Sequence, residues 1–254
     1  MPSNYIFLFG LMKIIKGIFS LLWRLWFALC FVIPFIALLP VTIFMTLSPK
    51  FYPVLYFFLH RISIFMMYAS GIFPKVNKKN KLDPKKQYLF CSNHTSTIDI
   101  PMMFFLSKKP IAFIGKASIS KYPIFGYYYK RFNVLVNRAS LRNSYAAFEQ
   151  AGQKIKDGQN MVIFPEGGIV KESLRLGKFK NGPFRLAVEQ NVSIIPITFA
   201  DNKQIFPVQY MKGKPQRARI TIHQPIDNCS TYSIEDLKNK VFNTIEKELI
   251  RYEN

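Results

Sequence analysis

Hydrophobic residues dominate the first part of the chain and are interrupted regularly by polar ones only further on. Residues 25–49 contain no charged side chain, and a second apolar segment follows at 51–74. The first stretch is long enough to cross the roughly 30 Å hydrocarbon core of a bilayer. His60 and Arg61 lie in the middle of the second segment, which disfavours a second simple span. The pattern predicts a helical hairpin embedded in a membrane, with a single crossing by residues 25–49 as the alternative.

A polar, basic stretch at 75–86 separates this region from a different pattern, in which short apolar strands alternate with amphipathic helices. Such alternation indicates an α/β fold with a mixed, largely parallel sheet flanked by helices. We therefore expect a membrane-embedded hairpin and linker at 1–82 and a second domain at 83–254. The predicted strands are 88–91, 111–114, 134–136, 161–164, 194–199 and 218–222. The predicted helices are 101–106, 140–156, 183–189 and one that begins after Ser233.

The composition of the chain indicates where the protein is located. The net charge is +21, while hydrophobic residues make up 50% of the sequence. Basic and apolar character together fit a protein that lies on an anionic membrane, and we expect no nucleic-acid partner. The three cysteines are scattered without paired or metal-ligand spacing, which argues against a disulfide framework and for a cytoplasmic location of the folded part. We see no two-His-plus-carboxylate spacing and expect no metal site.

The first stretch with chemical potential is Asn93-His94-Thr-Ser-Thr-Ile-Asp99, directly after the predicted strand 88–91. On a regular helix, residues five positions apart point about 140° away from each other. His94 and Asp99 can therefore meet only if the backbone turns between them, and the polar residues in between suit a turn. A carboxylate on one ring nitrogen would leave the other free as a base. The alternative is that Asp99 caps the following helix and His94 is an incidental loop residue.

A second polar segment follows the predicted strand 161–164. The sequence Pro165-Glu166-Gly167-Gly168 places a carboxylate on a tight turn at a strand end. In open α/β sheets, ligands bind beyond the carboxyl ends of strands. An ordinary loop with a solvated glutamate is the alternative for this segment taken alone.

The two segments together, Asn93-His94-(four residues)-Asp99 and then Phe164-Pro165-Glu166-Gly167, resemble the glycerolipid acyltransferases. Within that superfamily the chain looks most like the 1-acyl-sn-glycerol-3-phosphate (lysophosphatidic acid) acyltransferases. Intermediate stretches match in the same order, including Ile114-Gly115-Lys116, Phe132 to Arg138 and Lys178-Phe179-Lys180. The resemblance covers about residues 88–200. The chain departs from the family where Gly168-Ile169-Val170 replaces the threonine that commonly follows Pro-Glu-Gly.

Residue chemistry and the resemblance together suggest roles for eight residues. Acyl transfer to an alcohol needs a base for the hydroxyl proton, so we assign His94 as general base and Asp99 as the residue that orients it. Asn93, Gly167 and nearby backbone N–H groups are candidates to stabilise the oxyanion. A phosphate-bearing acceptor needs cationic partners, for which the candidates are Arg138, then Lys116, then Lys180; each could instead be a solvated surface charge. Glu166 would bond the acceptor's free hydroxyl or hold Arg138.

The resemblance implies an enzyme that moves a fatty acyl group from acyl-CoA or acyl carrier protein to the sn-2 hydroxyl of lysophosphatidic acid, without a cofactor or a covalent enzyme intermediate. Anionic membrane lipid would be its further partner, and the catalytic domain would face the cytoplasm. Two alternatives stay open. The altered residues after Gly167 would suit another acceptor, such as a lyso-aminolipid, another lysophospholipid or glycerol 3-phosphate. A catalytically silent protein that binds membranes through its basic surface is the other.

Overall fold

The computed structural model describes residues 3–136 and 141–254. Contacts within the chain divide it into two compact units. Unit 1 consists of Met1–Lys75, Thr95–Lys108 and Ala200–Arg219; unit 2 consists of Val76–His94, Lys109–Phe199 and Ile220–Asn254. Two later segments thus group with the hydrophobic N-terminal region. The separation of a membrane domain at 1–82 from a second domain at 83–254 stays a prediction.

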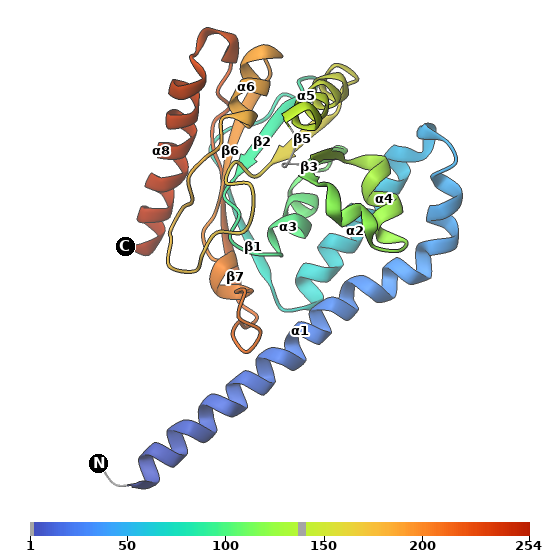
Figure 1. Ribbon diagram of the computed structural model, residues 1–254. Helices are drawn as coiled ribbons and strands as arrows, with labels where there is room; N and C mark the ends of the chain where they lie inside the picture. The colour runs from blue at the N-terminus through green and yellow to red at the C-terminus, as the bar shows by residue number, and fades with distance from the viewer. Residues whose placement is uncertain (1–2, 137–140) are drawn as a thin grey trace. The chain divides into compact units, whose positions relative to one another are not determined.

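Unit 1 is built on two apolar helices, α1 (Ser3–Met45) and α2 (Tyr52–Ala69), which pack against each other as a hairpin. The short 3₁₀ turn η1 (Pro49–Phe51) joins them. Within α1, Phe7–Met45 forms 39 residues of helix and contains an 18-residue stretch with a mean hydropathy of 2.6, which by length and composition is sufficient to cross a membrane. Figure 1 shows that α1 changes direction in its C-terminal part, where Pro34 and Pro40 interrupt the backbone hydrogen bonding.

Two short helices complete unit 1. The helix α3 (Asp99–Leu106) packs against α2, and the Tyr56 hydroxyl donates to the Ser107 carbonyl oxygen at its end over 3.1 Å. The helix α7 (Asn202–Ile205) follows in the 200–219 segment. The two predicted apolar segments are therefore helical, as expected, but the first helix begins well before residue 25.

Unit 2 is built around most of a seven-stranded sheet in the order β1-β7-β6-β2-β5-β3-β4, with β2 at its centre (Figure 1). The strands β2, β3, β4, β5 and β6 run parallel, and β7 is antiparallel to β6. The predicted mixed, largely parallel sheet flanked by helices is confirmed. The strand bounds are β1 (Phe73–Lys78), β2 (Tyr88–Ser92), β3 (Ile111–Lys116), β4 (Val134–Val136), β5 (Asn160–Ile163), β6 (Ser193–Phe199) and β7 (Arg217–Ile222).

Three helices cover one face of this sheet: α5 (Leu141–Lys156), α6 (Gly182–Glu189) and α8 (Ile234–Glu253). Alternate strand residues point into the same core, and α8 adds a row of residues at helical spacing. The Ser233 hydroxyl oxygen caps α8 by accepting from the Asp236 N–H over 3.0 Å, as the sequence predicts. The core residues from strands and α8 include Leu89, Cys91, Met161, Ile163, Leu237, Val241, Ile245 and Leu249.

Among the α-helices and strands of the described residues, sequence reasoning missed β1, α7 and α4 (Phe125–Phe132). The strand β1 spans the end of the second apolar segment and the start of the predicted linker, and it was missed because its residues are mostly exposed at the edge of the sheet and show no apolar alternation. The helix α4 was missed because its glycine and run of tyrosines give no clear helical propensity. The turn η2 (Ala117–Lys121) precedes it, and η3 (Cys229–Thr231) precedes α8.

Candidate active site

The predicted site segments follow the carboxyl ends of neighbouring parallel strands. Asn93 and His94 follow β2, and Phe164 to Gly167 follow β5; the register pairs Cys91 with Ile163. Parallel strands end at the same edge of a sheet, so these segments emerge side by side at its centre. The central position of β2, with parallel neighbours on both sides, explains why two sequence segments seventy residues apart can build one site.

The backbone and ring of His94 are both held by the segment after β5. The His94 N–H donates to Glu166 Oε2 over 2.8 Å, and its carbonyl oxygen accepts from the Val170 N–H over 3.1 Å. Its ring stacks on the Phe164 ring, with 4.0 Å between centroids and 16° between planes. The histidine is partly exposed. The backbone of His94 is thus fixed, and Phe164 covers one face of its imidazole.

Asp99 is fully buried in the first turn of α3, and three donors converge on its carboxylate. Oδ2 accepts from the N–H groups of Thr95 and Ser96 over 2.8 and 2.9 Å, and Oδ1 accepts from Asn202 Nδ2 over 2.7 Å. The carboxylate therefore reaches backward to the residue that follows His94 instead of capping its own helix. The turn that the sequence predicts between His94 and Asp99 is present, since the Asp99 N–H donates to the Ser96 carbonyl oxygen over 3.2 Å. Direct pairing of the two side chains stays a prediction.

Asn93 has a structural task that sequence reasoning did not foresee. It is buried, its amide Nδ2 donates to the Phe199 carbonyl oxygen over 3.0 Å, and its Oδ1 accepts from the Phe199 N–H over 2.8 Å. These two bonds join the residue after β2 to the last residue of β6. The predicted part of Asn93 in substrate binding stays a prediction, and these contacts give it no support.

Glu166 links the histidine to the loop that follows it in the chain. Its second oxygen, Oε1, accepts from the Gly177 N–H over 3.2 Å while Oε2 holds His94. A Cβ on Gly177 would lie 3.2 Å from Glu166 Cγ and 2.5 Å from Val170 Cγ1, so the glycine lets the loop close over the carboxylate. This geometry favours a bracing part for Glu166 over the predicted bond to the acceptor hydroxyl.

Gly167 and Lys180 lie in direct contact beside Glu166. Gly167 has φ +81°, a backbone conformation that favours glycine, and the place of its missing Cβ lies 2.8 Å from Lys180 Nζ. The Lys180 N–H also donates to the Pro165 carbonyl oxygen over 2.9 Å. The Gly167 N–H donates to the Phe164 carbonyl oxygen over 3.0 Å and closes the turn, and the part of Gly167 in stabilising an oxyanion stays a prediction.

The other predicted cations are not brought to the histidine by the described contacts. Lys116 is exposed at the end of β3. Arg138, two residues beyond β4 in the sequence, lies outside the described residues. Phosphate binding by Arg138, Lys116 and Lys180 therefore stays a prediction.

Sequence reasoning missed Asn202, which donates to Asp99. It lies 103 positions further along the chain, and a single buried asparagine in a short helix gives no signal of such a contact. Within residues 3–136 and 141–254, its Oδ1 finds no hydrogen-bond partner, and neither does the Thr95 hydroxyl. The amide orientation that places its N–H₂ on the carboxylate is thus fixed by Asp99 alone.

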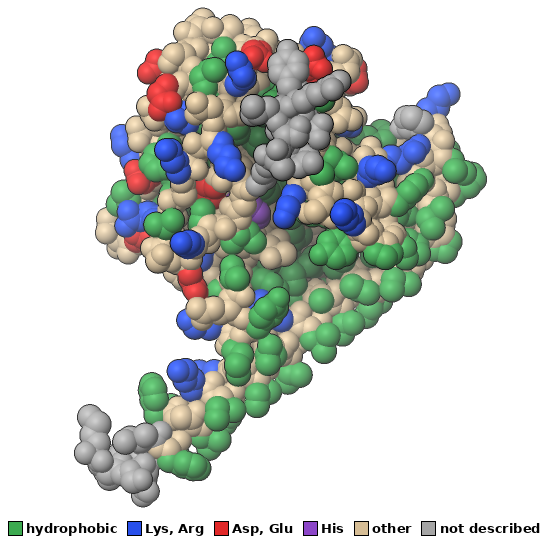
Figure 2. Space-filling model, in the orientation of Figure 1, with side chains coloured by type: hydrophobic (Ala, Val, Ile, Leu, Met, Phe, Trp, Pro, Cys, Tyr) green, Lys and Arg blue, Asp and Glu red, His purple; other side chains and the backbone are tan. Residues whose placement is uncertain are grey.

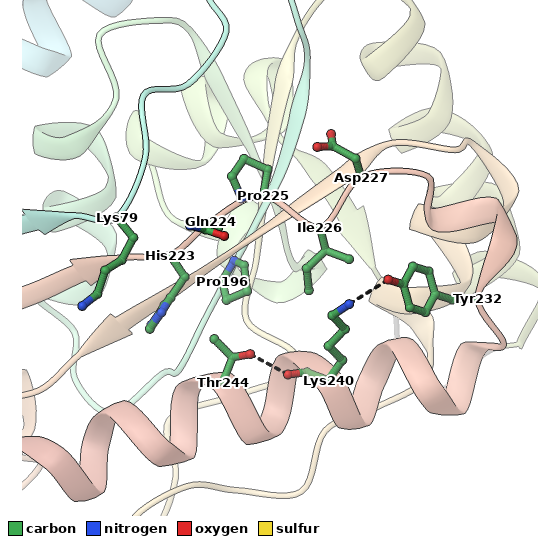
Figure 3. A pocket seen from close by; sticks show the side chains of 10 residues that line it. All are labelled: Lys79, Pro196, His223, Gln224, Pro225, Ile226, Asp227, Tyr232, Lys240 and Thr244. Carbon is green, nitrogen blue, oxygen red and sulfur yellow. Dashed lines mark hydrogen bonds between the residues drawn. The ribbon is translucent and has the colours of Figure 1, made fainter.

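A thiol, possible metal ligands and a pocket are the remaining candidates for a site among the described residues. Burial raises the pKa of the Cys91 thiol inside β2, so a thiolate nucleophile is disfavoured there. In the described part of the chain, no group of three His, Cys, Asp or Glu side chains could hold a metal ion. A pocket of about 500 Å³ between α8 and the turn after β7 contains none of the predicted site residues (Figure 3). It is lined by Lys79, Pro196, His223, Gln224, Pro225, Ile226, Asp227, Tyr232, Lys240 and Thr244.

Comparison with known families decides the broader assignment. Residues 73–200 match the family model described as Acyltransferase. The chain belongs to the acyltransferase family. All eight predicted site residues lie inside the matched segment, whereas α1, α2 and α8 lie outside it.

Individual members of the acyltransferase family show how far the similarity extends. A chloroplastic 1-acyl-sn-glycerol-3-phosphate acyltransferase of Arabidopsis thaliana is 31% identical over 168 residues, which is 65% of this chain and 46% of the relative. A lyso-ornithine lipid O-acyltransferase of Pseudomonas aeruginosa is 28% identical over 125 residues, 49% of this chain and 47% of the relative. The chain thus spans about half the length of these relatives.

The fold has a solved counterpart over most of its length. The crystal structure of the 1-acyl-sn-glycerophosphate (LPA) acyltransferase from Thermotoga maritima matches with a TM-score of 0.79 and 21% identity. The match covers 94% of this chain and 98% of that chain. At this identity the likeness establishes the fold, including the N-terminal helices, and not the substrate.

Proposed function

We propose that this acyltransferase-family protein moves a fatty acyl group from acyl-CoA or acyl carrier protein to the sn-2 hydroxyl of lysophosphatidic acid. The observation that supports this most directly is the turn from His94 to Asp99 at the carboxyl end of the central strand, with Glu166 fixing the histidine backbone. The Arabidopsis relative, whose name states the same reaction, adds support from sequence.

In the proposed reaction, His94 takes the proton of the acceptor hydroxyl as its oxygen attacks the thioester carbonyl carbon. The tetrahedral oxyanion then collapses, the C–S bond breaks, and the proton passes to the leaving thiolate. The new ester and the free thiol are the products, so no covalent enzyme intermediate or cofactor is needed. Asp99 would orient the imidazole, and Asn202 and the two turn N–H groups would hold Asp99.

The membrane position follows from α1 and from charge. A 39-residue helix that contains an 18-residue stretch with a mean hydropathy of 2.6 would insert in the bilayer that holds the lipid acceptor. The three cysteines are buried and free, which suits a reducing cytoplasmic location for the catalytic region. Anionic lipid would attract the net charge of +21.

The deciding experiment uses the purified full chain in detergent or vesicles with radiolabelled acyl donors. Lysophosphatidic acid should be acylated, and His94→Ala should lower kcat by about 10²–10⁴-fold with membrane association unchanged. Lys116→Ala is the matched cation control for acceptor affinity, since it should raise KM and leave kcat nearly intact. Turnover by His94→Ala at the wild-type rate would refute the mechanism.

A second acceptor is favoured by one observation in the loop after Glu166. A Cβ on Gly168 would meet nothing within 4 Å, so the residue that replaces the family's usual threonine leaves open space beside Gly167. The Pseudomonas relative is named for a lyso-ornithine lipid. If such a lyso-aminolipid is the acceptor, it should turn over faster than lysophosphatidic acid, and Gly168→Thr should shift the ratio toward the phosphate acceptor.

A further inference from the structure

The loop at residues 206–214, between α7 and β7, is fastened to α1 by a buried arginine. Arg24 lies on α1 and is 9% exposed. Its Nη2 donates to the carbonyl oxygens of Pro207, Gln209 and Lys212, and Nε also donates to Lys212. The guanidinium lies 4.1 Å from the Phe206 ring centroid. A cation in an apolar helix is thus satisfied by loop carbonyls, and the loop backbone faces α1.

Side chains extend this contact along two further turns of α1. The Phe27 and Phe206 rings lie 4.9 Å apart. The place of a Cβ on Gly17 lies 2.6 Å from Met211 Cε, so the absence of a side chain at Gly17 lets the methionine lie on the helix. The loop therefore follows α1 over the stretch in which that helix begins to bury one face.

Although its backbone faces α1 and Met211 touches that helix at Gly17, the loop leaves large apolar side chains exposed. Val208, Tyr210 and Met211 are 61%, 75% and 55% exposed. Over the same turns α1 exposes Leu22 and Leu25 at 62% and 58%. In Figure 2, hydrophobic side chains follow α1 along its length. The loop thus continues the apolar surface of the helix that is suited to a bilayer.

The charges around the loop match an anionic lipid surface. Lys212, Lys214 and Arg217 are exposed beside the apolar residues. The two acidic residues of unit 1, Asp99 and Asp201, are both buried, and Asp201 is paired with Arg219 at 2.6 Å. Exposed apolar side chains flanked by lysines, without exposed carboxylates, are typical of segments that enter the lipid headgroup region.

We propose that the 206–214 loop is a membrane-contact element separate from the helical hairpin. Val208, Tyr210 and Met211 enter the boundary between headgroups and acyl chains beside α1, while Lys212 and Lys214 bind phosphates of anionic lipids. The hydrogen bonds from Arg24 hold the loop at the same depth in the bilayer as the turn of α1 that carries Arg24. The inference rests on the insertion of α1 that the proposed function includes, and it is independent of which acceptor is acylated.

Depth-dependent fluorescence quenching tests the apolar part. The native cysteines are buried, so a thiol-reactive fluorophore added to the folded full chain labels an introduced cysteine, with the unsubstituted chain as blank. Val208→Cys and Met211→Cys, in phosphatidylcholine–phosphatidylglycerol vesicles, should be quenched by brominated lipid. Ile33→Cys on α1 is the positive control, and Asn239→Cys on the exposed side of α8 is the aqueous control.

Quenching of Ile33→Cys together with water-like behaviour of both loop labels would overturn the proposal and point to a soluble partner for the loop. Absence of quenching at Ile33→Cys would refute insertion of α1, and the loop proposal with it. Neither readout depends on turnover, so a failed acyl-transfer assay leaves the result intact.

The lysines are tested by lipid charge. Quenching of the Met211→Cys label should be stronger in vesicles containing phosphatidylglycerol than in phosphatidylcholine alone. Each of Lys212→Gln and Lys214→Gln should lower the ratio of inserted to water-exposed loop by about fivefold in the anionic vesicles. Lys247→Gln on α8 is the matched control and should have no effect. Equal quenching in both lipids would overturn the electrostatic part.

Discussion

The two units differ in where they place charge and apolar surface. Of the fourteen Asp and Glu residues, only Asp99 and Asp201 belong to unit 1, and both are buried. Most acids of unit 2 lie on helices, and several pair with nearby cations, as Glu189 does with Arg185 at 3.1 Å. Unit 1 instead exposes apolar residues along α1 and the 206–214 loop. A surface of mixed charges suits water, whereas the surface of unit 1 suits a lipid bilayer.

This contrast also separates the parts of the candidate site. Thr95, Ser96 and Asn202, which donate to Asp99, belong to unit 1 with it. Glu166 and Val170, which bond the His94 backbone, belong to unit 2 with it. Single substitutions can remove the bonds of Asp99 or those of His94 separately. The resulting changes in stability and hydrogen exchange test whether the two units unfold independently.

The largest effect is expected from Asp99→Ala. Removing the carboxylate leaves three buried donors without an acceptor, at roughly 3 kcal/mol or more of unfolding free energy. Hydrogen exchange should accelerate at 95–108 and 200–219 and stay slow in the strands of unit 2. Acyl transfer should be lost as well. Exchange measured by mass spectrometry on the full chain checks both statements.

Two variants calibrate that result. Asn202→Ala removes one donor and leaves the carboxylate its two backbone bonds, so its cost should be about 1 kcal/mol. Asp227→Ala removes an exposed carboxylate of unit 2, 3.5 Å from Lys86, and should change stability by less than about 1 kcal/mol. Uniform acceleration of exchange across both units in Asp99→Ala would show that the units do not open separately.

The second effect concerns pH and belongs to unit 2. Burial lowers the pKa of His223 to about 4, with Glu248, Lys79 and Arg251 as the charges around it. The unfolded chain binds this proton more readily than the folded chain. The contribution of His223 to the free energy of unfolding is therefore complete above pH 6.5 and is lost as the pH falls toward 4. The linkage amounts to about 3 kcal/mol. Chemical unfolding at a series of pH values measures it.

His223→Gln is the control for that titration, since glutamine can bond to the Thr198 hydroxyl, which lies 2.9 Å from His223 Nε2. This variant should lose most of the slope between pH 6.5 and 4. Retention of the full slope would assign the acid sensitivity to other groups. His223 lines the pocket beside α8, where Lys79 lies next to it in Figure 3, and this pocket contains none of the predicted site residues. Protonation of His223 should therefore lower turnover only by unfolding the protein.

Sequence reasoning succeeded where a pattern repeats and failed where a contact depends on the fold. The parallel strands β2 to β6 were predicted because buried parallel strands are continuous apolar runs, and the antiparallel strand β7 was predicted from the short apolar stretch at its end. The edge strand β1 has neither pattern. The turn between His94 and Asp99 was predicted because helical geometry excludes their meeting otherwise. The Asn202–Asp99 hydrogen bond and the hydrogen bonds from Arg24 to carbonyl oxygens of the 206–214 loop join residues more than a hundred positions apart. No local pattern specifies such pairs.

The smallest effect is expected in the loop that braces His94, where Gly167 and Gly168 form a matched pair. Gly167→Ala should cost about 1–2 kcal/mol, because its φ of +81° is unfavourable for alanine. A Cβ there would also lie 2.8 Å from Lys180 Nζ and displace that side chain. Gly168→Ala meets nothing within 4 Å and should change stability by less than about 0.5 kcal/mol.

The kinetic effects of this pair decide whether the loop acts through position or through substrate contact. If Glu166 and Lys180 hold the loop against His94, Gly167→Ala should lower kcat several-fold, whereas Gly168→Ala should leave kcat unchanged. A rise in KM for the acceptor in Gly167→Ala alone would indicate that displaced Lys180 binds the phosphate, as the sequence predicts. Equal kcat and KM for both variants would remove this loop from the mechanism and leave the bond from His94 N–H to Glu166 as a purely structural contact of unit 2.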